Sequence, residues 1–163
     1  MALNLSGGSW NCRSMKSLAA LVVFSLTLSA CAPLAIFASS SNNYRSSFGT
    51  QVANSRVNAF CISPPLRLAI WEFEGRFRKK IVMTSGYRTP WHNASVGGAS
   101  SSKHMSCDAA DFFIPGVPRS ELVAFAKTLS QVGGLGCYRG RNYIHIDTRQ
   151  RPRGYRGPVT WGC

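Results

Sequence analysis

Residues 143–147 read Tyr143-Ile144-His145-Ile146-Asp147, and this alternation of side chains decides how the domain is arranged. In a β-strand successive side chains point to opposite faces, so Ile144 and Ile146 share one face. Tyr143, His145 and Asp147 share the other. We therefore expect a strand that packs its isoleucines into a core and projects His145 and Asp147 together from the opposite face.

The segments around this strand predict a single α+β domain with a small, largely antiparallel sheet and flanking helices. In chain order we expect a helix beginning at Pro65, a strand at residues 81–84, a loop at 93–102, a strand at 109–114, a helix capped by Ser120, and strands at 135–138 and 143–148.

The first 38 residues predict a signal peptide, because Arg13 and Lys16 precede an apolar run at residues 18–28. Small residues then precede Cys31, as in a bacterial lipoprotein signal whose cysteine is lipidated. Cleavage near Ala38 and an uncleaved membrane span over residues 18–38 are the alternatives. Met15 is an alternative start. Each alternative exports the domain to the periplasm or cell envelope, with a membrane tether in two of the three.

Residues 39–58 are rich in Ser and Asn, which predicts a linker, and residues 59–163 are left as the folded domain. The formal charge of the chain is +13. Such a surface attracts polyanions, among them cell-wall polymer and anionic lipid. Export argues against nucleic acid as the partner, and no protein partner is indicated.

Four cysteines remain after the signal region, an even number in an exported domain, and this predicts two disulfides. They are Cys61, Cys107, Cys137 and Cys163. Three pairings are open. A four-cysteine zinc site is disfavoured because the chain has no CxxC pair.

The chain has only three histidines, His92, His104 and His145. His104 follows a Ser-rich loop, and Asp111 comes seven residues later on a predicted strand. Two imidazoles and one carboxylate, with a position left open for water, are the ligand set expected for hydrolysis at zinc. His104, Asp111 and His145 are therefore candidate ligands of one zinc ion, and we expect this zinc site on one face of the sheet.

Several short motifs occur in order between residues 81 and 161, and together they resemble a known family. They are Ser85-Gly86-Tyr87-Arg88, Asn93, Gly98-Ala99, Ser102-Lys103-His104, Ala109-Ala110-Asp111, Gly133-Gly134-Leu135-Gly136 and Tyr143-Ile144-His145-Ile146-Asp147-Thr148. The chain is similar to the zinc D-Ala-D-Ala carboxypeptidase group of the lysostaphin, D-Ala-D-Ala metallopeptidase and hedgehog superfamily. Within that group it most resembles the murein endopeptidase K branch.

The resemblance implies that His104, Asp111 and His145 hold the metal. It implies that Arg88 lies beside the substrate and pairs with its carboxylate or carbonyl, which a guanidinium does at any working pH. A structural ion pair to an acid of the sheet is the alternative for Arg88. Ser102 is expected to touch the substrate backbone. Asn93 matches a family motif and is a further candidate for binding substrate.

Two departures from the family pattern affect the site. Cys107 stands where relatives commonly have Gly, so we expect a strained backbone or a disulfide, with Cys137 as one partner to consider. Asn142 stands where many relatives have an acid three residues before the last histidine. Asp147 is then the best candidate for the catalytic base, with orientation of His145 as the alternative. His92 is a further candidate for stabilising an oxyanion.

The expected function is zinc-dependent hydrolysis of a peptide bond in peptidoglycan stem or cross-link peptides. The motifs leave endopeptidase and D-Ala-D-Ala carboxypeptidase activity open. A zinc-containing cell-wall-binding module without catalysis is the alternative from a different class. A basic protein that binds polyanions nonspecifically is a third hypothesis.

Overall fold

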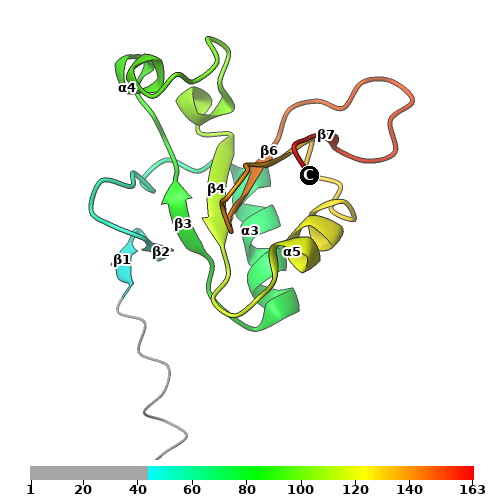
Figure 1. The fold of residues 1–163 in the computed structure, drawn as a ribbon, viewed down its shortest axis with the longest axis horizontal. Coiled ribbons are helices and arrows are strands. Elements are labelled where there is room, and N and C mark those ends of the chain that lie inside the picture. Colours follow the sequence, from blue (N-terminus) through cyan, green and yellow to red (C-terminus); the bar gives the residue numbers. More distant parts are fainter. Residues whose placement is uncertain (1–43) are drawn as a thin grey trace, which may run out of the picture. The chain divides into compact units, whose positions relative to one another are not determined.

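The computed structural model describes residues 44–163, which form one compact unit (Figure 1). The predicted signal peptide, the candidate lipidation site Cys31 and residues 39–43 of the predicted linker lie outside the described residues. Among the residues that are described, no helix has both the length and the apolar character needed to cross a membrane.

One seven-stranded sheet organises the domain, with the strand order β1-β2-β3-β4-β6-β5-β7. The strands are β1 (Arg45–Ser47), β2 (Thr50–Val52), β3 (Val82–Ser85), β4 (Ala109–Phe113), β5 (Gly134–Cys137), β6 (Ile144–Asp147) and β7 (Val159–Trp161). The pairs β2–β3 and β5–β7 are parallel. The α+β class is as predicted, but the expectation of a small, largely antiparallel sheet was wrong. The three-residue strands β1, β2 and β7 enlarge the sheet at its two ends, and both parallel pairings involve one of them.

The first two strands lie within residues 39–58, the segment predicted as a linker. β1 and β2 form a hairpin whose turn residues, Phe48 and Gly49, both have positive φ. Tyr44 contacts the ring of Phe113 on β4. The polar composition of this segment hid it, because a three-residue edge strand needs backbone pairing more than apolar side chains.

Three α-helices and one 3₁₀ helix accompany the sheet: α3 (Pro64–Phe77), α4 (Pro90–Ser95), η1 (Lys103–Ser106) and α5 (Arg119–Ala126). Proline occupies the first turn of α3, as predicted, and the left-handed Arg78 ends it. Part of the predicted loop at 93–102 belongs to α4 instead. Its cap is the Thr89 side chain, which accepts a hydrogen bond from the His92 backbone N–H. Pro118, and not Ser120, precedes α5.

The hydrophobic core lies between the sheet and the helices α3 and α5. Ile144 and Ile146 of β6 are fully buried in it, as the alternation predicted. Phe73 of α3 packs edge-to-face against Phe112 of β4 and Phe125 of α5. Figure 1 shows α3 crossing behind β4 and β6. The opposite face of these two strands is thereby left for polar side chains.

The four cysteines form two disulfides, Cys61–Cys107 and Cys137–Cys163. The suggested link between Cys107 and Cys137 was wrong. Cys107 has φ of 65°, the left-handed conformation that the glycine of relatives indicated, and its disulfide secures it to the segment before α3. The second disulfide holds the end of the chain, just after β7, against β5.

Candidate metal centre

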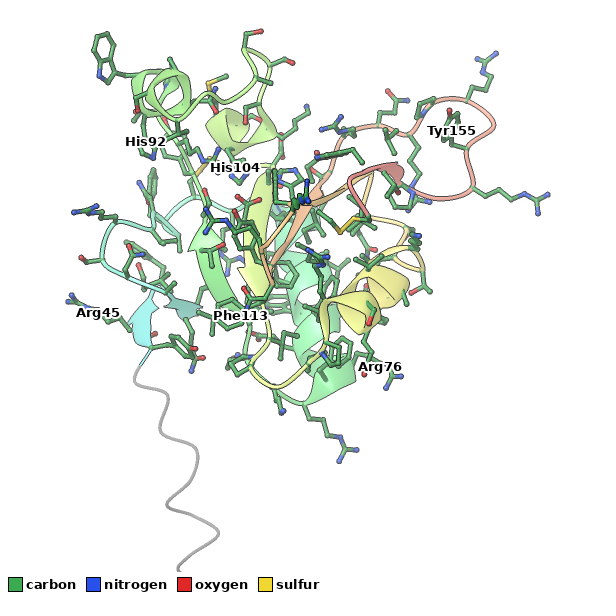
Figure 2. The ribbon with its side chains drawn as sticks, in the orientation of Figure 1. Arg45, Arg76, His92, His104, Phe113 and Tyr155 are labelled. Atoms are coloured by element: carbon green, nitrogen blue, oxygen red, sulfur yellow. A yellow bond between two sulfur atoms is a disulfide. The ribbon has the colours of Figure 1, made fainter. Side chains whose placement is uncertain are left out.

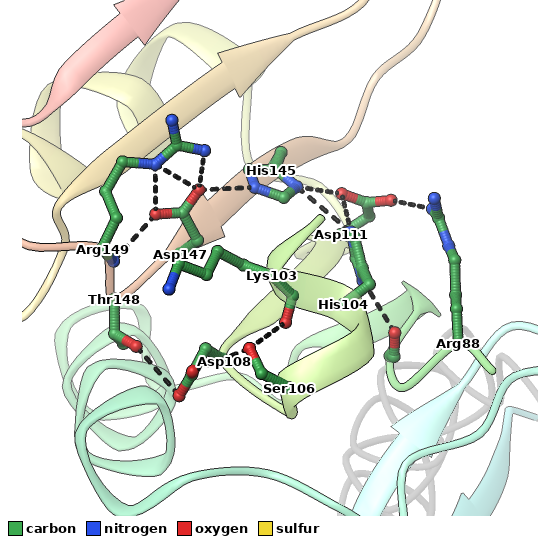
Figure 3. A network of polar contacts seen from close by, with 11 residues as sticks. Arg88, Lys103, His104, Ser106, Asp108, Asp111, His145, Asp147, Thr148 and Arg149 are labelled. Carbon is green, nitrogen blue, oxygen red and sulfur yellow. Dashed lines mark hydrogen bonds and ion pairs between the residues drawn. The ribbon is translucent and has the colours of Figure 1, made fainter. Parts of the chain in front are cut away.

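Two neighbouring strands and one short helix bring three ligand groups together. Asp111 on β4 and His145 on β6 are direct cross-strand partners, so their side chains leave the same face side by side. η1 places His104 over them. One donor atom from each residue lies within 4.8 Å of the other two, and all three residues are buried. The structure thus brings together the three ligands predicted from the sequence (Figure 3).

Each histidine has one ring nitrogen engaged outward and the other directed at the centre. His104 Nδ1 lies 2.7 Å from the Gly86 carbonyl oxygen, which can only accept, so Nδ1 carries the proton. Its Nε2 is left for a metal. His145 has the reverse arrangement. Its Nδ1 lies 2.8 Å from Asp111 Oδ1, and its Nε2 lies 3.1 Å from Asp147 Oδ2.

This donor set fits zinc. Two imidazole nitrogens and one carboxylate oxygen face each other. The outward nitrogens of His104 and His145 are hydrogen-bonded to a carbonyl and to a carboxylate respectively, as is usual for histidines that bind metal. Oδ1 of Asp111 lies 3.4 Å from His104 Nε2 as well. Three inward lone pairs close together favour a cation between them.

The protonation of the centre reflects these contacts. Burial would raise the pKa of Asp111, but hydrogen bonds and the charges of His104 and His145 outweigh it and bring the pKa well below the ordinary value. Burial would lower the pKa of His145, but its contacts with Asp111 and Asp147 raise it. Because a metal binds the neutral imidazole, the raised pKa of His145 means that protons compete with a metal for this centre.

Asp147 faces His145 from the side away from the predicted metal position. Its side chain is fully buried, and Arg149 pairs with it at 2.6 Å. Burial would raise its pKa, but the hydrogen bonds from His145 and Arg149 bring the pKa well below the usual range. A base needs reach to the attacking water, so this geometry favours the orienting role of Asp147 over the role of base.

Arg88 forms the structural ion pair that the sequence analysis gave as one of its two possible roles. Its Nε donates to Ser85 Oγ at 2.9 Å and its Nη2 donates to Asp111 Oδ2 at 3.0 Å. The guanidinium also lines the cleft described below. The ion pair with Asp111 holds Arg88 beside the candidate ligands.

The other three candidates lie in different places. Asn93 is buried, and its Nδ2 donates to the Ala99 carbonyl, which holds the loop that follows α4. Substrate binding by Asn93 stays a prediction, and this contact supports a structural role. Ser102 lines the cleft beside His104. His92 lies on the separate helix α4 and is exposed, bordering two smaller cavities (Figure 2).

A cleft of about 720 Å³ opens over the metal centre. It is lined by Arg88, Val96, Gly97, Gly98, Ala99, Ser101, Ser102, Lys103, His104, Asp111, Tyr138, Tyr143, His145, Arg149 and Trp161. Sequence reasoning missed Tyr138, Trp161, Lys103 and Arg149 as parts of the site. Tyr143 could have been found, because it shares the face of His145.

The pKa of Tyr138 is raised to about 12 by burial and by the charge of Asp111, so its hydroxyl stays protonated.

A family model described as peptidase M15 matches residues 42–147, which include all three ligand positions. The chain belongs to the peptidase M15 family. The resemblance inferred from the motifs is therefore confirmed, and it now extends to β1 and β2 on the N-terminal side of the first motif.

Two curated relatives resemble this M15 chain over about half of its length. The probable peptidoglycan L,D-endopeptidase MepK of Haemophilus influenzae is 39% identical over 88 residues, which cover 50% of the chain and 42% of the relative. The peptidoglycan L,D-endopeptidase MepK of Escherichia coli K12 is 34% identical over 94 residues, which cover 53% of the chain and 51% of the relative. The chain thus spans about half the length of these relatives, or less.

Proposed function

We propose that this M15 domain is a zinc-dependent peptidase that hydrolyses a peptide bond in peptidoglycan. The observation that supports this most directly is the buried His104, Asp111 and His145 group beneath an open cleft. These three residues would hold the ion. Zinc bound there would act as a Lewis acid on the scissile carbonyl and would lower the pKa of a water molecule.

The chain's own residues supply recognition and charge. Arg88, Lys103 and Arg149 line the cleft, and Asp111 is the only carboxylate among the described residues that do so. Because Asp111 is already shared between the histidines and Arg88, the free charge of the cleft is positive. Such a cleft attracts peptides that carry carboxylates, as peptidoglycan peptides do. The guanidinium of Arg88 is placed to pair with a substrate carbonyl or carboxylate beside the ligands.

The shape of the cleft favours an internal bond as the substrate. A second cavity of about 300 Å³ shares Arg88, Val96, Asp111 and Tyr143 with the cleft and continues beyond them to Arg141. A peptide lying in both cavities would extend past the metal centre, whereas a carboxypeptidase needs a closed end one residue past the scissile bond. We propose an endopeptidase acting on cross-linked stem peptides, in line with the names of both relatives.

A wall-binding module without turnover is the second candidate. It is favoured by the scarcity of acids in the cleft, since Asp147 faces away and Asn142 replaces the acid of many relatives. Basic residues and aromatic rings would then hold peptidoglycan without cutting it.

Digestion of purified sacculi by the zinc-loaded protein tests these proposals, with mass spectrometry of the soluble fragments. New uncross-linked muropeptides without free D-Ala would support the endopeptidase. Free D-Ala would contradict the choice of bond. Binding to sacculi without released fragments would support the wall-binding module. The His104→Ala variant, which lacks a ligand, should release nothing.

A further inference from the structure

Arg149 and Asp147 form the most densely bonded ion pair of the domain. Arg149 Nε donates to both carboxylate oxygens of Asp147 at 2.8 and 2.9 Å, and Arg149 Nη2 donates to Oδ2 at 2.6 Å. The backbone N–H of Arg149 donates to Oδ1 at 3.0 Å. A carboxylate held by four donor contacts from one residue has little freedom to rotate.

Other groups hold this pair in position. A Cβ on Gly134 would lie 2.4 Å from Asp147 Oδ2, so the carboxylate fits only because β5 has glycine there. The guanidinium of Arg149 lies 5.0 Å from the ring centroid of Trp161, within the range of a cation–π contact. The Trp161 ring lies over Gly136 of β5. Trp161 is two residues before Cys163, which forms the disulfide to β5.

The immobilised carboxylate then acts on a metal ligand. Asp147 Oδ2 accepts from His145 Nε2, which fixes the ring orientation and places the lone pair of Nδ1 toward Asp111 and His104. Figure 3 shows Arg149, Asp147, His145 and Asp111 joined in one continuous row of contacts. If the carboxylate rotated, His145 could turn Nε2 toward the centre, or could carry its proton on Nδ1, which faces the centre.

We propose that Arg149 is a positioning residue that fixes His145 for metal binding through Asp147, with Trp161 holding the guanidinium in place. This inference rests on the metal centre of the proposed function. Arg149 does not contact the ligand group directly. Arg149 orders the Asp147 carboxylate already in the metal-free protein, so that His145 presents Nδ1 to the centre before a metal binds.

Arg149 also lines the cleft, and a role in binding substrate would equally reduce peptidase activity when it is replaced. The two roles separate when no substrate is present. A substrate contact leaves zinc affinity unchanged, whereas a positioning residue changes it.

The test is competition for zinc between a chromophoric chelator and the purified protein without substrate. Arg149→Gln should weaken zinc binding about 10-fold, and Asp147→Asn should weaken it by about 10- to 100-fold, the range typical of groups that orient metal ligands. Arg149→Lys should recover part of the affinity, because an ammonium pairs with the carboxylate but cannot contact both oxygens in the same fork. Arg153→Gln, in the same loop but exposed, is the matched control and should bind zinc as the wild type does.

A second measurement separates positioning from simple loss of stability. The melting temperature of Arg149→Gln should rise less on addition of zinc than that of the wild type, whatever its value without zinc. Unchanged zinc affinity in Arg149→Gln would overturn the inference, even if the wild type digests sacculi. A wild type that binds zinc but releases no fragments would contradict the proposed function and leave this inference standing.

Discussion

Replacing Gly134 by alanine should damage the metal centre without touching any ligand. The new Cβ would lie 2.4 Å from one carboxylate oxygen of Asp147 and 2.5 Å from the other, whereas ordinary contact begins at 3.4 Å. The carboxylate must therefore move by about 1 Å. It is fully buried and bonded on its other sides by Arg149, so the movement lengthens its bond to His145 Nε2.

The expected cost has two parts. Overpacking of this kind lowers the free energy of unfolding by about 1–3 kcal/mol, and each kcal/mol lowers the melting temperature by roughly 4 °C in a domain of this size. Zinc affinity should fall about 10- to 100-fold, because His145 loses its orientation. Calorimetry without zinc measures the first part, and chelator competition measures the second.

Gly75→Ala is the matched control. Gly75 is an exposed residue of α3, and a Cβ there meets nothing within 4 Å. This variant should gain about 0.5–1 kcal/mol of stability, because alanine favours a helix interior, and should bind zinc normally. If Gly134→Ala kept both wild-type stability and wild-type zinc affinity, the reasoning about the space around Asp147 would be refuted.

Three further predictions follow from the site and the core. The raised pKa of His145 contributes stability below about pH 6.5, and this stability is lost as pH rises through the folded-state pKa. The melting temperature of the metal-free wild type should therefore exceed that of His145→Gln by less at pH 8.5 than at pH 5.5. A gap that widens with pH would contradict this sign. Arg88→Lys keeps the positive charge but loses the two forked guanidinium donors that contact Ser85 and Asp111. It should lower kcat/KM on a cross-linked muropeptide at least roughly 10-fold while zinc stays at one per chain. Loss of zinc would show instead that Arg88 is needed for the metal centre. Phe73→Ala removes a fully buried ring between α3, β4 and α5 and should cost about 3–5 kcal/mol in denaturant unfolding, and a cost below 1 kcal/mol would contradict the packing described.

The central strands were predictable because their signals are local. β4 and β6 follow the alternation of their own side chains, and the helix α3 begins at its prolines. The three-residue strands β1, β2 and β7 were not predicted. Each is too short to show a clear alternation of side chains, and each pairs through its backbone with a neighbouring strand. Such pairing depends on segments distant in the chain.

The candidate metal centre likewise depends partly on local sequence and partly on tertiary contacts. The sequence by itself determined that His145 and Asp147 share a face, because strand alternation is a property of consecutive residues. Only the tertiary structure decided what each nitrogen of His145 meets. Asp111 reaches Nδ1 from β4, and the Asp147 carboxylate is turned to Nε2 by Arg149, by the gap at Gly134 and by a tryptophan that a disulfide holds on β7. Tautomer and orientation are set by contacts between strands, and these contacts exist only once the chain has folded.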